Sequence, residues 1–358
     1  MNQKLKDWLA RIEPLGSELT PALLAHQNDL TKPQGALGRL EEVAVWLGRV
    51  QNSLLLQSQK KRIYCFAGDH GVVEEGVSAY PKEVTPQMVG NMLAGGAAIN
   101  QLAQAAQAEL WVVDLGVDAE LAPHPKLVQK KVAKGTANLA QGPAMTLEQV
   151  QAAIWVGIEL AQTSHQEGVH LLGTGEMGIG NSTSAAALIC AYLKLRPEAV
   201  VGRGTGVNDQ GLKHKTQVVA RALDLHQQAL DNPLETLAAL GGLEIAGITG
   251  LVLGAAALKI AVVVDGFISS AGALAAIALK PEVKDYLIFS HLSAETGHQA
   301  FAQALGVRPL VNLDLRLGEG TGAALAFGLI EGAVACHNQM ATFSGASVSR
   351  KVEALLKH

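Results

Sequence analysis

Aromatic residues are scarce in this sequence. Phe, Trp and Tyr make up 4% of the 358 residues, although hydrophobic residues as a whole reach 49%. The core must therefore be built from Ala, Val, Leu, Ile and Gly, whose small side chains let helices and strands approach closely. A chain of this length exceeds what one core usually supports, so we expect one large domain with a smaller appendage.

The sequence also has no large excess or cluster of charges of one sign. The formal net charge is −4 and acidic and basic residues are interspersed, with no run of Lys and Arg that could neutralise a phosphate backbone. Nucleic acid is therefore not an expected partner. The hydrophobic stretch 251–279 is interrupted by Lys259 and Asp265, and charges are costly inside a bilayer, so we predict a buried helix followed by a strand rather than a membrane span.

Cysteine is rare, and the spacing of the three cysteines does not suggest disulfide bonds. Cys65, Cys190 and Cys336 are widely spaced, and each lies in or beside an apolar stretch, which is typical of buried thiols in a reducing compartment. The amino end has neither an apolar h-region nor a small-residue cleavage site, so no secretory signal is expected. These features together predict a cytoplasmic protein.

Short aliphatic runs alternate with longer Ala- and Leu-rich stretches, which is typical of a parallel sheet covered by helices on both faces. The predicted strands are 62–67, 110–115, 170–172, 199–201, 260–264, 286–289 and 310–315. Glycine or polar clusters follow them, and in such sheets the ligand crevice lies beyond the carboxyl ends of the strands. The sequence therefore predicts an α/β fold whose polar clusters converge there.

The two ends of the chain have a different pattern. Residues 1–60 are helical in pattern without a strand candidate, and 336–358 again have an amphipathic helical pattern. We therefore predict a small helical subdomain formed by both termini around an α/β catalytic domain over 61–335.

Three glycine strings carry the strongest functional signals. Gly173-Thr-Gly-Glu-Met-Gly178 fits G-x-G-x-x-G, and 179–184 then opens an Ala-rich helix. The string by itself suggests NAD, but its physics requires only a phosphate at a helix N-terminus, and no ribose-binding acid ends a second strand about 20 residues further on. A phosphate site is favoured; a dinucleotide site and a purely structural turn are the alternatives.

The second string, 202–206, is followed by Lys213 and Lys215, either of which can pair with a phosphate or remain a solvated lysine. In the third string, 318–322, glycines flank Glu319, leaving bare backbone around a carboxylate at the predicted end of a strand. If an apolar substrate closed over this carboxylate, its pKa would rise, which suits a general base. An exposed turn glutamate is the alternative.

Other candidate sites are weaker. Asp69-His70 is either an acid and base pair or a hydrogen-bonded structural pair, and the second is the more common outcome. His291 and His298 stand a heptad apart, but neither H-E-x-x-H nor a Cys/His cluster is present, so no metal is expected. A G-x-S-x-G elbow and a P-loop are also missing, which excludes a serine hydrolase and a nucleoside triphosphatase of those types.

Taken together, several long strings resemble the nicotinate-nucleotide:dimethylbenzimidazole phosphoribosyltransferase family of cobalamin biosynthesis. They are L-T-K-P-Q-G-A-L-G-R-L-E at 30–41, F-A-G-D-H-G-V at 66–72, V-S-A-Y-P-K-E-V-T at 77–85, N-M-L-A-G-G-A-A-I-N at 91–100, S-H-L-S-A-E-T-G-H at 290–298 and L-D-L-R-L-G-E-G-T-G-A-A-L at 313–325, besides the strings that begin at 173 and 202. The resemblance spans nearly the whole chain. It implies a Rossmann-like parallel sheet with a small helical domain, a homodimer, and no cofactor.

The resemblance also implies roles for individual residues. Glu319 is the expected base, with Glu176 and Lys215 beside the transferred ribose. The expected base pocket consists of Tyr80, Met88, Met177 and Leu317. The glycine loops are expected to hold the 5′-phosphate, through Gly175, Gly178, Gly180, Asn181, Ser182, Gly204, Thr205 and Gly206. An NAD-dependent oxidoreductase and a catalytically silent nucleotide-binding protein are the competing hypotheses.

Overall fold

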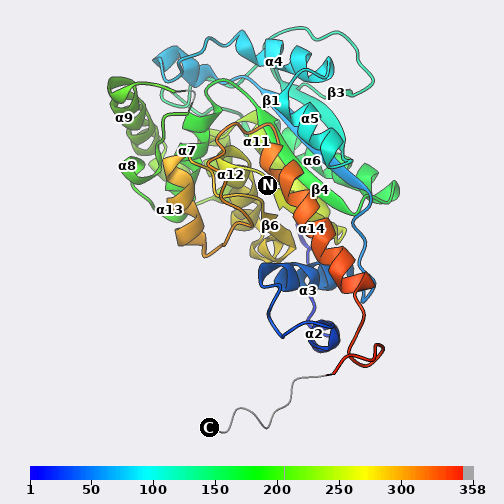
Figure 1. The fold of residues 1–358 in the computed structure, drawn as a ribbon. Helices are drawn as coiled ribbons and strands as arrows, with labels where there is room; N and C mark the ends of the chain where they lie inside the picture. Colours follow the sequence, from blue (N-terminus) through cyan, green and yellow to red (C-terminus); the bar gives the residue numbers. More distant parts are fainter. Residues whose placement is uncertain (205, 350–358) are drawn as a thin grey trace. The chain divides into compact units, whose positions relative to one another are not determined.

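The computed structural model describes residues 1–204 and 206–349, which divide into two compact units. The larger unit is made of Met1–Pro14 and Lys60–Phe327, and the smaller of Leu15–Gln59 and the segment that begins at Gly328. The larger unit contains a six-stranded parallel sheet with the order β3-β2-β1-β4-β5-β6 (Figure 1). This is the strand order of a doubly wound Rossmann-type sheet, in which the order reverses between β1 and β4.

The strands are β1 Lys61–Gly68, β2 Glu109–Gly116, β3 Leu127–Gln129, β4 Leu171–Met177, β5 Ala261–Val264 and β6 Leu287–Phe289. The helices of the larger unit are α1 Gln3–Leu9, α4 Val84–Leu93, α5 Ala98–Ala105, α6 Leu147–Gln166, α7 Asn181–Leu193, α8 Pro197–Val200, α9 Asp209–Leu225, α10 Pro233–Leu240, α11 Leu243–Ala257, α12 Phe267–Leu279 and α13 Thr296–Leu305. Helix α14, Thr321–Gln339, begins in the larger unit and ends in the smaller one.

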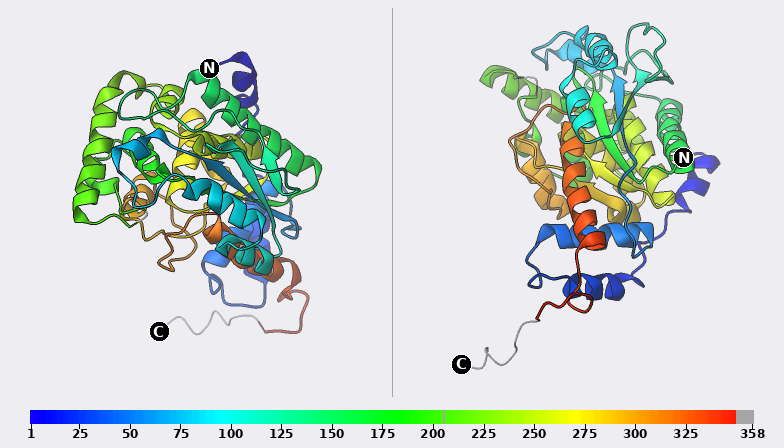
Figure 2. Two further views of the ribbon diagram at one scale, coloured as in Figure 1. Left: turned by 90° about the horizontal axis from the view of Figure 1, so that it is seen from above. Right: turned by 45° about the vertical axis from the view of Figure 1, so that its right-hand side comes forward.

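Helices cover both faces of the sheet, as two further views show (Figure 2). Every residue of β1 is buried, so this strand has no alternation of polar and apolar positions. On one face, a Cβ atom placed on Gly247 of α11 would lie 2.7 Å from the ring of Phe66 in β1. On the other face, a Cβ on Gly173 of β4 would lie 2.9 Å from Ile63 and 3.3 Å from Ala323 of α14. The sheet is therefore a central layer between α11 and α14.

Small residues replace aromatic bulk where helices meet. A Cβ atom on Gly157 of α6 would lie 2.1 Å from the carbonyl oxygen of Gly247, and one on Gly250 would lie 1.9 Å from that of Ile154. Helices α6 and α11 thus touch backbone to backbone, and any larger side chain would force them apart. The low aromatic content of the sequence is a consequence of this mode of packing.

The smaller unit is helical and is formed by two segments that are far apart in the sequence. It contains α2 Thr20–Asp29, α3 Arg39–Gln51 and the end of α14. The Gln27 Nε2 atom lies 2.8 Å from His337 Nδ1, and Leu30 forms an isolated bridge with Thr342. Residues 340–349 are not helical, although we predicted an amphipathic helix over 336–358; the rest of that prediction lies outside the described residues.

Five of the seven predicted strands are present, and two predictions are wrong. Residues 199–201 were predicted as a strand, but Pro197 fixes the first turn of the short helix α8 and Val201 donates its N–H to the Pro197 carbonyl. Residues 310–315 run beside the chain that follows β6 with only an isolated bridge from Val311 to His291, because Asp314 has a left-handed backbone, φ 53°. Strand β3 was not predicted.

The apolar stretch 251–279 is buried, as predicted. It forms the end of α11, then β5, and then α12, a second buried helix that was not predicted. None of the helices among the described residues is long and apolar enough to cross a membrane. Cys65, Cys190 and Cys336 are free thiols, and the first two are buried.

Candidate active site

A cavity of about 490 Å³ lies at the carboxyl ends of the strands in the larger unit. Segments that follow β4, β5 and β6 line it, together with the glycine loop before α14 and the segment that leads into α4. The lining residues are Tyr80, Val84, Met88, Glu176, Met177, Gly178, Ile179, Asn181, Ser182, Gly204, Gly266, Phe267, Ile268, His291, Ser293, Glu295, Arg316, Leu317, Gly318 and Glu319. This is where the strand order predicts a ligand crevice.

Glu319 lies in this cavity and not in an exposed turn. Its backbone is left-handed, with φ 64° between Gly318 at 84° and Gly320 at 96°, and its side chain is only 4% exposed. Atom Oε2 has no hydrogen-bond partner among the described residues. Burial, with a smaller contribution from the charge of Asp265, raises the pKa of Glu319 above its ordinary value. A carboxyl group with a raised pKa in the wall of a cavity is suited to act as a general base.

Asp265 fixes the loop that carries Glu319. Its carboxylate accepts hydrogen bonds from the backbone N–H groups of Gly320 at 3.0 Å, Gly322 at 2.7 Å and Ala323 at 3.1 Å. These are N–H groups at the start of α14 that no earlier turn can satisfy. Burial raises the pKa of Asp265 to about 6 even though the backbone donors oppose it. The start of α14 is thus occupied by a carboxylate of the protein.

Glu176 lies opposite this loop, at the end of β4. Asn181 Nδ2 donates to its Oε2 atom, and a Cβ atom on Gly318 would lie 2.2 Å from its Oε1 atom. Burial and the nearby charge of Asp265 raise the pKa of Glu176 to about 8. The loop comes this close because Gly175 has no side chain: a Cβ there would lie 2.5 Å from the Glu319 carbonyl oxygen. Two carboxyl groups therefore share one cavity.

The start of α7 forms the other end of the cavity. Gly180 precedes the helix with φ 94°, and no side chain caps it. Lys215 of α9 is buried, and its Nζ donates to Ser182 Oγ at 2.8 Å; burial lowers its pKa to about 8. A Cβ on Gly204 would lie 2.6 Å from that hydroxyl and 2.8 Å from Nζ. An uncapped helix N-terminus beside a lysine is suited to bind an anion.

The structure brings most of the predicted site residues together. Lining the cavity are Glu319, Glu176, Tyr80, Met88, Met177, Leu317, Gly178, Asn181, Ser182 and Gly204. Gly175, Gly180 and Lys215 lie directly behind the lining, in the contacts described above. Gly206, with φ 104°, is not among the lining residues, and Thr205 lies outside the described residues.

Sequence reasoning did not single out several residues of the cavity. Among the lining residues, Ser293, Glu295 and Arg316 were not discussed individually. Asp265, next to the lining residue Gly266, was expected only as part of a polar cluster at a strand end and as a charge that interrupts an apolar stretch. His291 was expected at the end of a strand and was otherwise considered only as a metal ligand. The signal was position, since Asp265 directly follows β5 and His291 is the second residue after β6.

Asp69 and His70 each form hydrogen bonds with other residues of the protein. His70 Nε2 lies 2.6 Å from Glu244 Oε1, with both side chains fully buried. Asp69 Oδ2 accepts from the Asp118 backbone N–H at 2.8 Å. Neither residue lines the cavity, and each bonds to a different residue, which favours separate structural roles over an acid and base pair.

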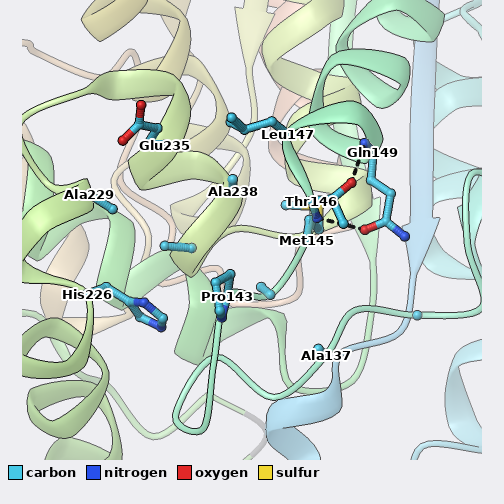
Figure 3. A pocket seen from close by; sticks show the side chains of 13 residues that line it. Ala137, Pro143, Met145, Thr146, Leu147, Gln149, His226, Ala229, Glu235 and Ala238 are labelled. Carbon is cyan, nitrogen blue, oxygen red and sulfur yellow. Dashed lines mark hydrogen bonds between the residues drawn. The ribbon is translucent and has the colours of Figure 1, made fainter.

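A second cavity, of about 600 Å³, lies at the start of α6 and beside α10 (Figure 3). Its lining is mostly apolar, with Glu235 and His226 as the ionisable side chains. His226 Nε2 lies 2.9 Å from the Leu139 carbonyl oxygen, and the Thr146 and Gln149 side chains cap α6. This cavity is larger, but its polar groups already have protein partners.

The glycine string at 173–178 forms most of β4 and ends just after it, whereas the dinucleotide fingerprint of a sheet with this order follows β1. The position thus disfavours NAD. The fold and the cavity define an α/β protein with an uncapped helix start beside a buried lysine and a pair of buried carboxyl groups next to it.

The chain belongs to the phosphoribosyltransferase family, whose model matches residues 12–348. It is 55% identical over 351 residues to the nicotinate-nucleotide–dimethylbenzimidazole phosphoribosyltransferase of Prosthecochloris aestuarii, covering 98% of this chain and 99% of that one. It is 57% identical over 357 residues to the protein of the same name from Chlorobium chlorochromatii, covering 99% and 100%. The crystal structure of CobT from Thermus thermophilus superposes with a TM-score of 0.88 at 49% identity, covering 93% of this chain and 100% of that one.

Proposed function

We propose that this protein transfers the phosphoribosyl group of nicotinate mononucleotide to 5,6-dimethylbenzimidazole or a related base, giving α-ribazole 5′-phosphate and nicotinate, in assembly of the lower ligand of cobalamin. The names of relatives that match nearly the whole chain support this reaction. The single observation that carries it at the level of residues is the buried carboxyl group of Glu319 in the wall of the cavity that also contains Glu176 and the start of α7.

The donor carries its own leaving group. In nicotinate mononucleotide the glycosidic nitrogen is a cationic pyridinium, so the bond from C1′ to this nitrogen breaks with its electron pair going to nicotinate. One nitrogen of the benzimidazole forms the new bond to C1′ from the opposite face, which inverts β to α. The other nitrogen loses its proton to Glu319, whose raised pKa makes it a base matched to this task. The reaction needs no cofactor.

The remaining residues divide between the sugar phosphate and the base. The N–H groups at the start of α7, Ser182 and Lys215 are the proposed 5′-phosphate site, since an anion restores the charge balance of the buried lysine. Glu176, next to Glu319, is the proposed partner of positive charge that develops on the ribose. Tyr80, Met88, Met177 and Leu317 are the proposed contacts of the acceptor base, and most of their surface is apolar.

One assay tests the proposal. The protein is incubated with nicotinate mononucleotide and 5,6-dimethylbenzimidazole, and nicotinate and α-ribazole phosphate are followed by chromatography. We expect both products in equal amounts, and neither when the base is omitted. Absence of nicotinate release under these conditions contradicts the proposal, and reduction of NAD by any substrate would favour the oxidoreductase hypothesis instead.

Assembly and location belong to the same proposal. We infer a homodimer from the family resemblance, and light scattering after size exclusion tests it, with a monomer as the contradicting result. The free thiols Cys65, Cys190 and Cys336 fit a reducing, cytoplasmic location, which cell fractionation tests. The division into a catalytic domain over 61–335 and a helical subdomain from the two termini is also proposed, and limited proteolysis tests it.

A further inference from the structure

His291 is a buried histidine of the active-site cavity that uses only one of its ring nitrogens. It follows β6 and is 1% exposed. Its Nδ1 atom lies 2.9 Å from Ser290 Oγ. The Ser290 hydroxyl donates to the Asp265 carbonyl oxygen at 3.2 Å. Because a hydroxyl has a single hydrogen, the Nδ1 atom must carry the proton of the bond between His291 and Ser290.

The Asp265 carboxylate favours the same arrangement. Its Oδ1 atom lies 4.0 Å from His291 Nδ1, and a negative charge there attracts a proton to this nitrogen and not to the far one. Burial lowers the pKa of His291 to about 4, so the ring is neutral near pH 7. A neutral ring protonated at Nδ1 presents a lone pair at Nε2, which can only accept a hydrogen bond.

The Nε2 atom is left for a ligand. No described residue forms a hydrogen bond with it, and a Cβ atom placed on Gly266, another lining residue, would lie 3.5 Å from it. The ring is also held in place, since a Cβ on Gly322 would lie 1.9 Å from Nδ1. The Nε2 atom of His291 is therefore a rigidly held hydrogen-bond acceptor at the cavity wall, next to Gly266.

His298, seven residues further on, shows the contrast. Its Nδ1 atom accepts from the Ser293 backbone N–H at 2.8 Å, and its Nε2 atom lies 3.1 Å from Ser270 Oγ. Both ring nitrogens are thus used inside the protein. His298 supports the segment 291–298, whereas His291 retains a free nitrogen.

The chemistry of the proposed donor selects the partner. The phosphate and the nicotinate carboxylate are acceptors only, and the N–H of the benzimidazole is assigned to Glu319. The ribose hydroxyls are the donors that remain. We propose that His291 Nε2 accepts a hydrogen bond from a ribose hydroxyl of nicotinate mononucleotide and so determines the preference for a ribonucleotide over its deoxy analogues. This inference rests on the proposed function.

The test compares three nucleotides, nicotinate mononucleotide and its 2′-deoxy and 3′-deoxy analogues, by kcat/KM for nicotinate release and by calorimetric binding. The unmodified protein is expected to prefer the ribonucleotide over at least one analogue by about 10- to 100-fold in kcat/KM. In His291→Phe, which keeps a flat ring and removes the acceptor, that ratio is expected to fall to about 2- to 3-fold, with the loss confined to the ribonucleotide. His124→Gln, on an exposed loop, is the control that should retain the full ratio.

Two results would overturn the inference: an unmodified protein that does not distinguish the analogues, or a His291→Phe protein that distinguishes them as well as before. If His291→Phe does not fold, Ser290→Ala replaces it. This variant removes the group that fixes the tautomer, and the ratio should again decrease. Failure of the proposed function is separable, because the unmodified protein would then release no nicotinate from any of the three nucleotides, whereas calorimetry would still report the hydroxyl preference.

Discussion

Two helix starts border the same cavity, and they differ in what occupies them. At α14, the Asp265 carboxylate already accepts from three backbone N–H groups. At α7, Gly180 has no capping side chain, and the buried Lys215 lies beside Ser182. Similar glycine strings therefore perform different tasks. The strings at 173 and 318 look alike because both let backbone approach closely. The position of Asp265 decides which helix start remains uncapped, and this is the start to which we assign the phosphate.

The largest expected effect lies on the α14 side. Glu319→Gln keeps the shape of the side chain and removes the base, so we expect kcat to fall by about 10²- to 10⁴-fold. Binding of nicotinate mononucleotide should change by less than about 3-fold, since we assign the phosphate to α7. Steady-state kinetics and calorimetry measure the two effects. An equal loss in kcat and in binding affinity would contradict the assignment of proton removal to the α14 side and of phosphate binding to the α7 side.

Removing Asp265 should make the two helix starts alike. Asp265→Ala leaves three N–H groups without their acceptor, and we expect the free energy of unfolding to fall by about 2–4 kcal/mol. Thr146→Ala, which removes an ordinary cap from α6, is the control and should cost about 1 kcal/mol. Urea denaturation compares them. Equal losses would show that Asp265 is an ordinary cap.

The α7 side predicts an alkaline limit to activity. The pKa of Lys215 is lowered to about 8, so the ammonium loses its proton above that pH and the proposed phosphate site loses its cation. We expect kcat/KM to decrease by up to about 10-fold per pH unit above about 8. In Lys215→Arg the decrease should shift to higher pH, because arginine stays charged.

Glu176 also titrates near pH 8, which calls for a second variant in the same experiment. If the alkaline limit stays in Lys215→Arg and disappears in Glu176→Gln, the carboxyl group and not the lysine is responsible. That result would contradict the assignment of the limit to the α7 side.

The last expected effect concerns stability, through the carboxyl group of Glu176. The folded protein keeps the Glu176 proton up to about pH 8, whereas an ordinary glutamate loses it near 4.5. Between these values the folded state binds more protons than the unfolded chain, so this group lowers stability as pH rises. Glu176→Gln should therefore gain about 3–4 kcal/mol in unfolding free energy, relative to the unmodified protein, from pH 5 to pH 8. A constant difference would contradict the raised pKa.

The fold was largely predictable because its signals are local. Strands such as β1 are apolar runs that end at polar clusters, and the glycine strings mark places where backbones meet. The errors are local as well. Three apolar residues at 199–201 fit a strand or one helical turn equally well, and β3 has only three residues.

The site residues could be predicted only where the family resemblance or a position at the end of a strand pointed to them. Glu319 and Glu176 stand in glycine strings that are visible in the sequence. The role of Asp265 depends on β5 lying next to β4, so that its carboxylate reaches a helix that begins 56 residues later. The free nitrogen of His291 depends on a serine next to it and on backbone from two other segments. Such roles arise from strand order, which periodicity does not encode.

The rim of the cavity has one further consequence. Tyr80 and Leu317 are each 55% exposed, whereas Glu176, Glu319 and Lys215 are buried among backbone atoms. Substitution of either exposed side chain should barely affect folding. Substitution of a buried residue is expected to disturb the glycine loops that surround it. Under the proposed assignment, substitutions at these two positions can change which aromatic base is accepted without disturbing the buried residues proposed to hold the sugar phosphate.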